Sequence, residues 1–262
     1  MKQLLCTLLI TITLFGCKKT ENIEPPADVA PKKSVKQLTA SSSDYISYEY
    51  DANGNVTRYI SQWQNGTGGV NRLNNVFEYS GNKLTRFSNE AGYASFTYIG
   101  ARIDKSDHFA ANGRKLSSFH YEYDQTGKIT SILEQISNPD SDGINETKIS
   151  YQYYANGNVS KMDFLYKKGT NDPFVLSSSK LFVEYDNKKN PEPDGIAGFF
   201  LPGVILQKNN PVKINNVSPN GTIEGYSRYE YTYNAEGYPV SRKHFLAVGS
   251  TEPSPVIFQY TY

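Results

Sequence analysis

The chain has 262 residues, of which 27 are Lys or Arg and 26 are Asp or Glu, so its charge is close to balanced. A balanced charge argues against nucleic acid, or a generic acidic surface, as the partner of this protein. The composition includes 21 Tyr, 13 Phe and 20 Gly but only 2 Met. High aromatic and glycine content favours strands joined by turns over helices.

The first residues are predicted to be a targeting segment. A basic start at Met1-Lys2 is followed by an apolar run from Leu4 to Phe15 and then by Gly16-Cys17. The run is shorter than the about 20 apolar residues of a spanning helix, so residues 1–16 are typical of a secretory signal. The letters L-F-G-C resemble the bacterial lipobox, which implies that Cys17 is the lipid-attached first residue of the mature protein. The alternative is an ordinary signal peptide with a chance cysteine.

The rest of the chain is expected to form a tether and one domain. Cys6 would leave with the signal, so the mature chain would keep only Cys17 and could form no disulfide. Residues 17–44 are charged and contain Pro and Ser, which predicts a lipid-anchored flexible tether. Residues 45–262 are expected to form a single β domain.

A unit of sequence, Tyr48 to Arg58 (Y-E-Y-D-A-N-G-N-V-T-R), returns along the domain. Tyr48 and Tyr50 lie two apart and therefore share one face of a strand. Asn53-Gly54 predicts a tight turn in which both residues can take positive φ, and Val56 begins the next strand. Later units follow Tyr79, Tyr98, Tyr123, Tyr153 and Tyr233.

These units predict an all-β fold. No stretch keeps helical periodicity for three turns, and the strand before each turn alternates aromatic with polar residues. Strands with one aromatic face and one polar, water-facing face fit an antiparallel up-and-down meander, in which the sheet curves around its own core. The uneven distance between units argues against a solenoid and fits loops of different lengths at one end.

A basic residue follows most turns, as in Val56-Thr57-Arg58 and Val240-Ser241-Arg242. Simple alternation places Arg58, Arg86 and Lys161 on the same face as Val56, Leu84 and Val159. If that face met lipid, each charge near the bilayer midplane would cost about 2–4 kcal/mol. We therefore predict a soluble, tethered domain. A membrane-spanning barrel is the rival, because the C-terminal strand alternates and ends in an aromatic residue.

One segment breaks the rhythm of the units. Tyr185-Asp186 begins a unit, but Pro191 stands where the β-branched residue should be, and the apolar stretch Gly195 to Leu206 follows. We interpret residues 190–213 as one long loop insertion that packs over an open end of the sheet. It acts either as a plug that closes the core or as a loop that binds a partner or covers a ligand.

The Tyr-Asp-x-x-Gly units resemble the YD repeats of Rhs-type proteins. A second resemblance covers about Tyr45 to Tyr262. It depends on three short motifs, which are Asn190-Pro191 after Asp186, Asn209-Asn210-Pro211, and Gly237-Tyr238-Pro239. Together with the lipobox, this series resembles a family of Gram-negative lipoproteins, a domain of unknown function with a porin-like fold. The resemblance implies a curved sheet wrapping toward a porin-like barrel, with no assigned activity and no catalytic residues.

Metal-binding and catalytic candidates are weak. Asp140, Asp142, Asn145 and Glu146 resemble half of a calcium loop, but the remaining ligands are missing, so a solvated hairpin loop is the preferred interpretation. The histidines His108, His120 and His244 show no metal-ligand spacing. Paired carboxylates for glycan hydrolysis stay open, with these conceivable members: Asp104, Asp107, Glu122 and Asp163.

Function is therefore predicted only in outline. The chain is expected to be an extracytoplasmic lipoprotein of the bacterial cell envelope, anchored at the outer membrane. Both the periplasmic side and the cell-surface side of that membrane are consistent with the sequence. It is expected to be a non-catalytic binding or interaction module, with no cofactor, whose partner is a glycan or an envelope protein. The alternatives are a carboxylate-based hydrolase acting on glycans and a structural subunit of an envelope complex.

Overall fold

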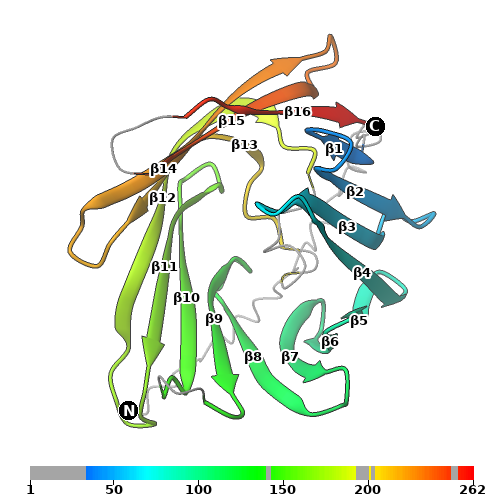
Figure 1. Cartoon of the computed structure of the whole chain (residues 1–262). Helices are drawn as coiled ribbons and strands as arrows, with labels where there is room; N and C mark the ends of the chain where they lie inside the picture. Colours follow the sequence, from blue (N-terminus) through cyan, green and yellow to red (C-terminus); the bar gives the residue numbers. More distant parts are fainter. Residues whose placement is uncertain (1–33, 140–142, 193–200, 202–203, 249–252) are drawn as a thin grey trace, which may run out of the picture. The chain divides into compact units, whose positions relative to one another are not determined.

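The structure, a computed structural model, describes residues 34–139, 143–192, 201, 204–248 and 253–262. The described part contains sixteen strands: β1 (Gln37–Thr39), β2 (Tyr45–Tyr50), β3 (Val56–Gln64), β4 (Val70–Ser80), β5 (Lys83–Asn89), β6 (Gly92–Ile99), β7 (Arg102–Ala110), β8 (Lys115–Tyr123), β9 (Ile129–Ile136), β10 (Glu146–Tyr153), β11 (Val159–Lys167), β12 (Val175–Lys189), β13 (Asn209–Val217), β14 (Ile223–Tyr233), β15 (Pro239–Val248) and β16 (Val256–Thr261). Each pairs antiparallel with the next, and β16 pairs with β1, so the sheet is a closed barrel (Figure 1).

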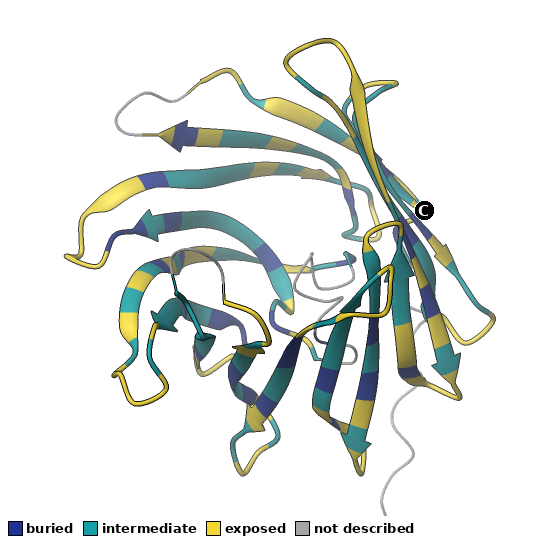
Figure 2. Ribbon diagram, turned by 60° about the horizontal axis from the view of Figure 1, so that its bottom comes forward, coloured by how far each residue is buried: buried dark blue, intermediate teal, exposed yellow. Residues whose placement is uncertain are grey.

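This architecture confirms the predicted fold class, an all-β antiparallel meander with one long insertion. The turns of the repeated units lie at one end of the barrel, here called the turn end, and connections such as β3–β4 and β15–β16 lie at the opposite end, here called the loop end. Along the strands, exposed residues alternate with buried or half-buried ones (Figure 2). None of the described residues belongs to a helix long and apolar enough to cross a membrane.

The predicted start of the domain at Tyr45 is wrong. Val35 and Leu38, which precede Tyr45, are completely buried in the core. Gln37–Thr39 forms β1, which hydrogen-bonds to β2 on one side and to β16 on the other. Three residues are too few to show alternation in a sequence, and their conformation comes from pairing at both edges. The signal segment, Cys17 and the tether up to residue 33 lie outside the described residues.

The turn after Tyr50 uses positive φ at its glycine alone. Gly54 has φ of 81°, as expected, whereas no described residue other than glycine, Asn53 included, has positive φ. Hydrogen bonds of Asp51 complete the turn. Asp51 Oδ1 accepts the backbone N–H groups of Asn53 and Asn55, at 2.8 and 2.9 Å. This three-residue loop with a left-handed glycine is a common hairpin connection, and Asp51 holds it closed.

A β-bulge follows the turn and changes which side chains of the strand face the barrel interior. Glu49 pairs with Arg58 and Tyr50 pairs with Val56, so Thr57 has no partner across the ladder. Because side chains alternate with period two, this extra residue moves Arg58 to the opposite face from Val56.

The bulge recurs after later turns, between Leu84 and Arg86 and between Val159 and Lys161. The expectation that these basic residues share a face with the preceding apolar residue is therefore wrong. Leu84 and Val159 are buried in the barrel interior, whereas the basic residues lie on the outer wall beside carboxylates. The aromatic residues two positions before the leading tyrosines are buried as predicted: Tyr48, Phe77, Phe96, Tyr121 and Tyr151.

The leading tyrosine of one unit is bonded to the bulge of the unit before it. Tyr79 donates its hydroxyl to the carbonyl oxygen of Val56 at 2.9 Å, directly before the bulge residue. Burial raises the pKa of Tyr79 to about 12, so the phenol stays protonated and can donate. The same bond recurs at 2.8–3.0 Å from Tyr98 to Leu84, Tyr153 to Ile129, Tyr185 to Val159 and Tyr262 to Pro239. This ladder explains why these positions hold Tyr rather than Phe.

The plug is defined here as the described residues Asn190–Glu192, Leu201 and Val204–Lys208, which enter the barrel between β12 and β13. Leu201 and Leu206 are 1% and 3% exposed and belong to the core. Leu206 accepts a backbone hydrogen bond from Val159 at 2.8 Å. The interpretation of this segment as a plug that packs into the core is confirmed for these residues, but its predicted end at residue 213 is wrong, because β13 already begins at Asn209.

Replacing Tyr79, Tyr98 or Tyr153 by Phe is expected to lower the free energy of unfolding by roughly 1–3 kcal/mol each, because a partly buried carbonyl loses its donor. Urea denaturation measures this loss. The control is Tyr93→Phe, since the Tyr93 ring stacks on Phe109 but no hydrogen bond of its hydroxyl to a described residue is found. Equal losses for the control and the three ladder variants would contradict the ladder.

Candidate functional site

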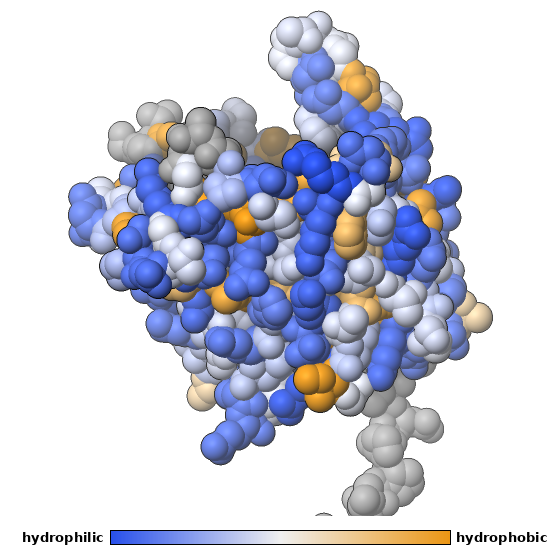
Figure 3. All heavy atoms as spheres, turned by 90° about the horizontal axis from the view of Figure 1, so that it is seen from below, coloured by the Kyte–Doolittle hydropathy of each residue, from blue (hydrophilic) through white to orange (hydrophobic). Residues whose placement is uncertain are grey.

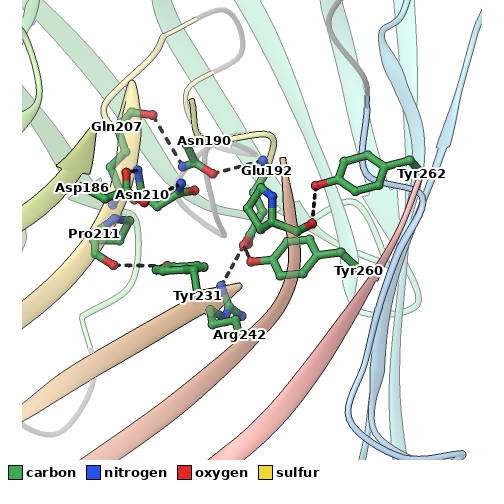
Figure 4. Close-up of polar contacts among 11 residues, drawn as sticks. Asp186, Asn190, Glu192, Gln207, Asn210, Pro211, Tyr231, Arg242, Tyr260 and Tyr262 are labelled. Carbon is green, nitrogen blue, oxygen red and sulfur yellow. Dashed lines mark hydrogen bonds and ion pairs between the residues drawn. The ribbon is translucent and has the colours of Figure 1, made fainter. Parts of the chain in front are cut away.

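A buried ion pair joins the plug to the barrel wall. Arg242 Nη1 on β15 lies 2.7 Å from Glu192 Oε1 of the plug, and the two side chains are only 14% and 18% exposed. Tyr260 on β16 donates its hydroxyl to the same carboxylate oxygen at 2.6 Å (Figure 4). Glu192 therefore connects the plug to two neighbouring strands of the wall.

Arg242 faces the interior because it lies one residue farther along the chain from its turn than the other basic residues lie from theirs. Pro239 pairs with Tyr233, and the bulge follows at Val240. Ser241 therefore takes the outward position that Arg58 and Lys161 take in their units, and Arg242 pairs with the inward Tyr231. A shift of one residue moves a side chain from one face of a sheet to the other.

Aromatic rings surround the Arg242 guanidinium. Its central carbon lies 5.0 Å from the ring centre of Phe258, 5.6 Å from that of Tyr229 and 5.9 Å from that of Tyr260. Cations are attracted to the faces of such rings, and the attraction grows where water is excluded. The guanidinium is therefore held by one carboxylate and three rings.

The charges in this site affect the tyrosines around it. Burial raises the pKa of Tyr260, and the nearby Glu192 carboxylate raises it further. The same two causes raise the pKa of Tyr48, from β2 on the far side of the β16–β1 closure. Burial works against the charge of Arg242, but Glu192 outweighs it and raises the pKa of the guanidinium. The tyrosines thus stay neutral donors and Arg242 stays charged.

The motifs that carry the family resemblance form the frame of the plug. Asp186 accepts hydrogen bonds from the backbone N–H and the side-chain amide of Asn210, at 3.1 and 3.0 Å, and from the hydroxyl of Tyr233. Asn190 Oδ1 accepts the N–H of Glu192 at 3.1 Å, and Pro211 accepts the hydroxyl of Tyr231. These residues fix the two ends of the insertion.

A small polar cavity of about 120 Å³ lies beside the ion pair. It is lined by the plug residues Asn190, Glu192 and Gln207 and by wall residues that include Tyr229 and Arg242. Arg242 Nε is buried and has no hydrogen-bond partner among the described residues. A cavity of this size and polarity has room for a few water molecules, which would complete the bonding of the guanidinium.

A larger hollow opens at the loop end, here called the mouth hollow. Its volume is about 540 Å³, and its lining includes Trp63, Phe258, Ile46, Gln62 and Asp44. Trp63 is the single tryptophan of the chain and is 44% exposed. Exposed aromatic surface beside hydrogen-bonding groups is typical of sites that bind small organic ligands.

The calcium-like string is only partly described. Asp140 and Asp142 lie outside the described residues. The Asn145 side chain donates to the carbonyl oxygen of Lys168, and Glu146 lies 2.7 Å from Lys167 Nζ. Within the described ranges, no cluster of three or more His, Cys, Asp or Glu side chains could hold a metal ion.

Two of the three histidines, His108 and His244, pack against aromatic rings inside the barrel. His108 faces the interior against Phe119 and lies 3.1 Å from the Ser106 hydroxyl. His244 stacks on Tyr229. Burial lowers the pKa of both to about 4, with Arg242 adding to the effect at His244. His120 lies on the outward face of β8, opposite Lys105.

Three of the four candidate carboxylates are engaged on the outer wall. Asp107 lies 2.7 Å from Lys115 and 3.0 Å from Lys105. Its partial burial raises the pKa of the carboxyl, but the hydrogen bonds from Lys115, Ser118 and Lys105 outweigh this and lower the pKa. Asp163 lies 2.9 Å from Lys161, and Glu122 accepts a hydrogen bond from Ser131. Asp104, the fourth, is exposed at the bulge of β7.

Sequence reasoning missed Glu192, Arg242 and the buried Asn158. The signal for Arg242 was its offset of one residue within a repeated pattern. Glu192 directly follows the proline that breaks the rhythm. Asn158 repeats the turn chemistry of Asn55, so nothing in the sequence distinguishes it from a surface turn residue.

The fold resembles solved structures, although the sequence comparisons find no relative. No protein-family model matches the chain, and no curated protein matches it either. A porin-like protein from Bacteroides uniformis aligns at a TM-score of 0.56 and 14% identity, covering 88% of this chain and 98% of that one. One from Bacteroides vulgatus aligns at 0.52 and 14%, covering 88% and 99%. These similarities show the fold.

Breaking the ion pair is expected to destabilise the barrel. Glu192→Leu or Arg242→Met alone should lower the free energy of unfolding by about 3–5 kcal/mol, because each leaves a buried charge without its partner. The double variant Glu192→Leu/Arg242→Met should lose much less than the sum, as a double-mutant cycle in urea measures.

The matched control is Arg228→Met, which removes an outer-wall partner of Glu230 and should cost less than about 1 kcal/mol. Additive losses in the Glu192 and Arg242 cycle would show that the two residues act independently.

Proposed function

We propose that this chain is a lipid-anchored, non-catalytic binding module of the bacterial cell envelope that takes a glycan ligand in the mouth hollow. The observation that carries the proposal is the hollow itself, in which the half-exposed Trp63 lies beside Gln62, Ser41 and Ser61. An aromatic face bordered by hydroxyl and amide groups suits a sugar ring, which offers apolar C–H faces and hydroxyl edges.

The outer wall supports a domain that is tethered rather than embedded in lipid. Ion pairs recur around it, from Glu49 with Arg58 on β2 and β3 to Glu230 with Arg228 on β14. Hydrophilic residues cover most of the face seen in Figure 3, and the hydrophobic residues on it are scattered. If the outer wall faced lipid, burying these charges would cost about 2–4 kcal/mol for each Arg or Lys near the bilayer midplane.

The plug supports binding rather than conduction. Leu201 and Leu206 occupy the core near the turn end, and Glu192 ties the plug to Arg242. A ligand entering from the loop end would therefore meet a packed interior.

Hydrolysis has less support than binding. A glycoside hydrolase needs two carboxylates flanking one bond, about 5–10 Å apart. Among the described residues that line the mouth hollow, Asp44 is the single carboxylate. Its oxygens accept hydrogen bonds from the Ser41 hydroxyl and the Gln64 backbone.

The anchor is tested by replacing Cys17 with Ser in cells. Loss of the acylated residue should move the protein from the membrane fraction to the soluble envelope fraction, because acyl chains supply the membrane affinity. Fractionation and immunoblotting measure the change. A Cys17→Ser protein that stays in the membrane fraction, or a wild-type protein that conducts ions in a planar bilayer, would contradict a tethered, non-spanning domain.

The ligand site is tested by the fluorescence of Trp63, the single tryptophan. Titrating the full mature protein in detergent with neutral oligosaccharides such as cellohexaose and maltohexaose should shift the emission for at least one sugar. Trp63→Ala should lower the affinity measured by calorimetry about tenfold, roughly the 1.4 kcal/mol of a lost stacking contact. The control is Ile99→Ala, an exposed apolar side chain at the turn end. Unchanged affinity in Trp63→Ala would place the ligand elsewhere.

A further inference from the structure

A row of cations crosses the turn end of the barrel. Lys83, Arg102 and Lys128 each stand immediately before the buried residue that begins the inward face of a strand. Each lies over the leading tyrosine of the next unit: Lys83 over Tyr98 at 5.3 Å, Arg102 over Tyr123 at 5.5 Å and Lys128 over Tyr153 at 5.3 Å. These three successive hairpins thus each carry one cation, held on an aromatic ring.

The plug supplies the fourth cation where the wall lacks one. In the next unit the equivalent position is Asn158, which is fully buried and accepts the Lys208 backbone N–H at 2.7 Å. This bond brings Lys208 to the same rim. A Cβ on Gly157 would lie 2.8 Å from Lys208 Nζ, and one on Gly127 would lie 2.8 Å from an Arg102 Nη atom. Glycine at these turns leaves room for the cations to lie across them.

Three of these cations border one hollow of about 240 Å³. Arg102, Lys128 and Lys208 line it, with the rings of Tyr123 and Tyr153. No carboxylate belongs to its described lining, and no ion pair joins these three cations to a described carboxylate. On the outer wall, by contrast, basic residues pair with carboxylates, as Arg58 does with Glu49 on the neighbouring strand and Lys161 with Asp163 on its own strand. Among the described residues, these three cations of the rim therefore have no carboxylate paired with them.

We propose that this row, Lys83, Arg102, Lys128 and Lys208, binds an acidic polysaccharide whose carboxylate or sulfate groups recur on every second sugar. Successive cations belong to hairpins two strands apart, which corresponds to a spacing of about 9–10 Å across the sheet. An alternating acidic polysaccharide presents its charges at intervals of two sugar rings, a comparable length. This deepens the proposed glycan-binding function with a second site at the opposite end of the barrel from the mouth hollow.

A nucleic acid fits this row less well. A nucleic acid strand advances only about 3.4 Å per phosphate, far less than the distance between neighbouring cations. Single-stranded nucleic acids are also bound by bases stacking on open aromatic faces. Here the rings of Tyr98, Tyr123 and Tyr153 are covered by the cations themselves.

The test uses the full mature protein in detergent and three labelled probes measured by fluorescence anisotropy. The probes are a hyaluronan decasaccharide, which is charged on every second sugar, a neutral dextran of similar length and a single-stranded DNA decamer. The variant is Arg102→Gln/Lys128→Gln. The matched control is Lys148→Gln/Lys161→Gln, which removes the same charge from the ion-paired outer wall. Thermal melting checks that both variants fold.

Hyaluronan is expected to bind more tightly than dextran and DNA, and its affinity should fall as salt rises. Arg102→Gln/Lys128→Gln should weaken its binding about tenfold, while the control stays within about twofold. Lys208→Gln alone should weaken it as well. Equal losses in variant and control, DNA binding as tight as hyaluronan binding, or no hyaluronan binding at low salt would each overturn the proposal. Trp63→Ala should keep hyaluronan binding, so failure at the mouth hollow and failure at this row are distinguished.

Discussion

The one-residue bulge after the turn of each repeated unit is the constraint on which the rest of this barrel depends. It moves Arg58, Arg86 and Lys161 to the outer wall and leaves Val56, Leu84 and Val159 inside. Without the extra residue, the basic side chains would enter the core with the apolar ones. At five bulges the hydroxyl of the next tyrosine bonds to the carbonyl before the bulge, as Tyr79 does with Val56. These hairpins are thereby tied to the ones before them.

The same rule produces the interior charge. Arg242 stands one residue beyond the usual basic position and so lies inside, where Glu192 and three aromatic rings surround it. A buried ion pair is weak evidence for high stability, because well-packed apolar residues often do as well. Its effect here is positional, since the carboxylate accepts bonds only where Arg242 and Tyr260 converge. That geometry seats the plug in one orientation.

The two ends of the barrel consequently differ in chemistry. The turn end carries cations on tyrosine rings and is filled by the plug, whereas the loop end opens into a hollow lined by Trp63 and Phe258. The porin-like structures with the same fold share only 14% of their residues with this chain. Alternation and turn chemistry are enough to specify such a barrel, so the fold places few limits on what either end binds.

The sequence by itself determined the strands, the turns and the inward face of the tyrosines, because alternation and glycine-containing turns are local properties of the chain. It also marked Pro191 as the place where the repeat stops. Only the tertiary structure decided the closure through β1, whose three residues are ordered by strands at the two ends of the domain. The bulges likewise could be identified only from the pairing of each strand with its neighbour. Glu192 and Arg242 lie fifty residues apart in the chain, and their contact exists only because the closed wall brings β15 beside the plug.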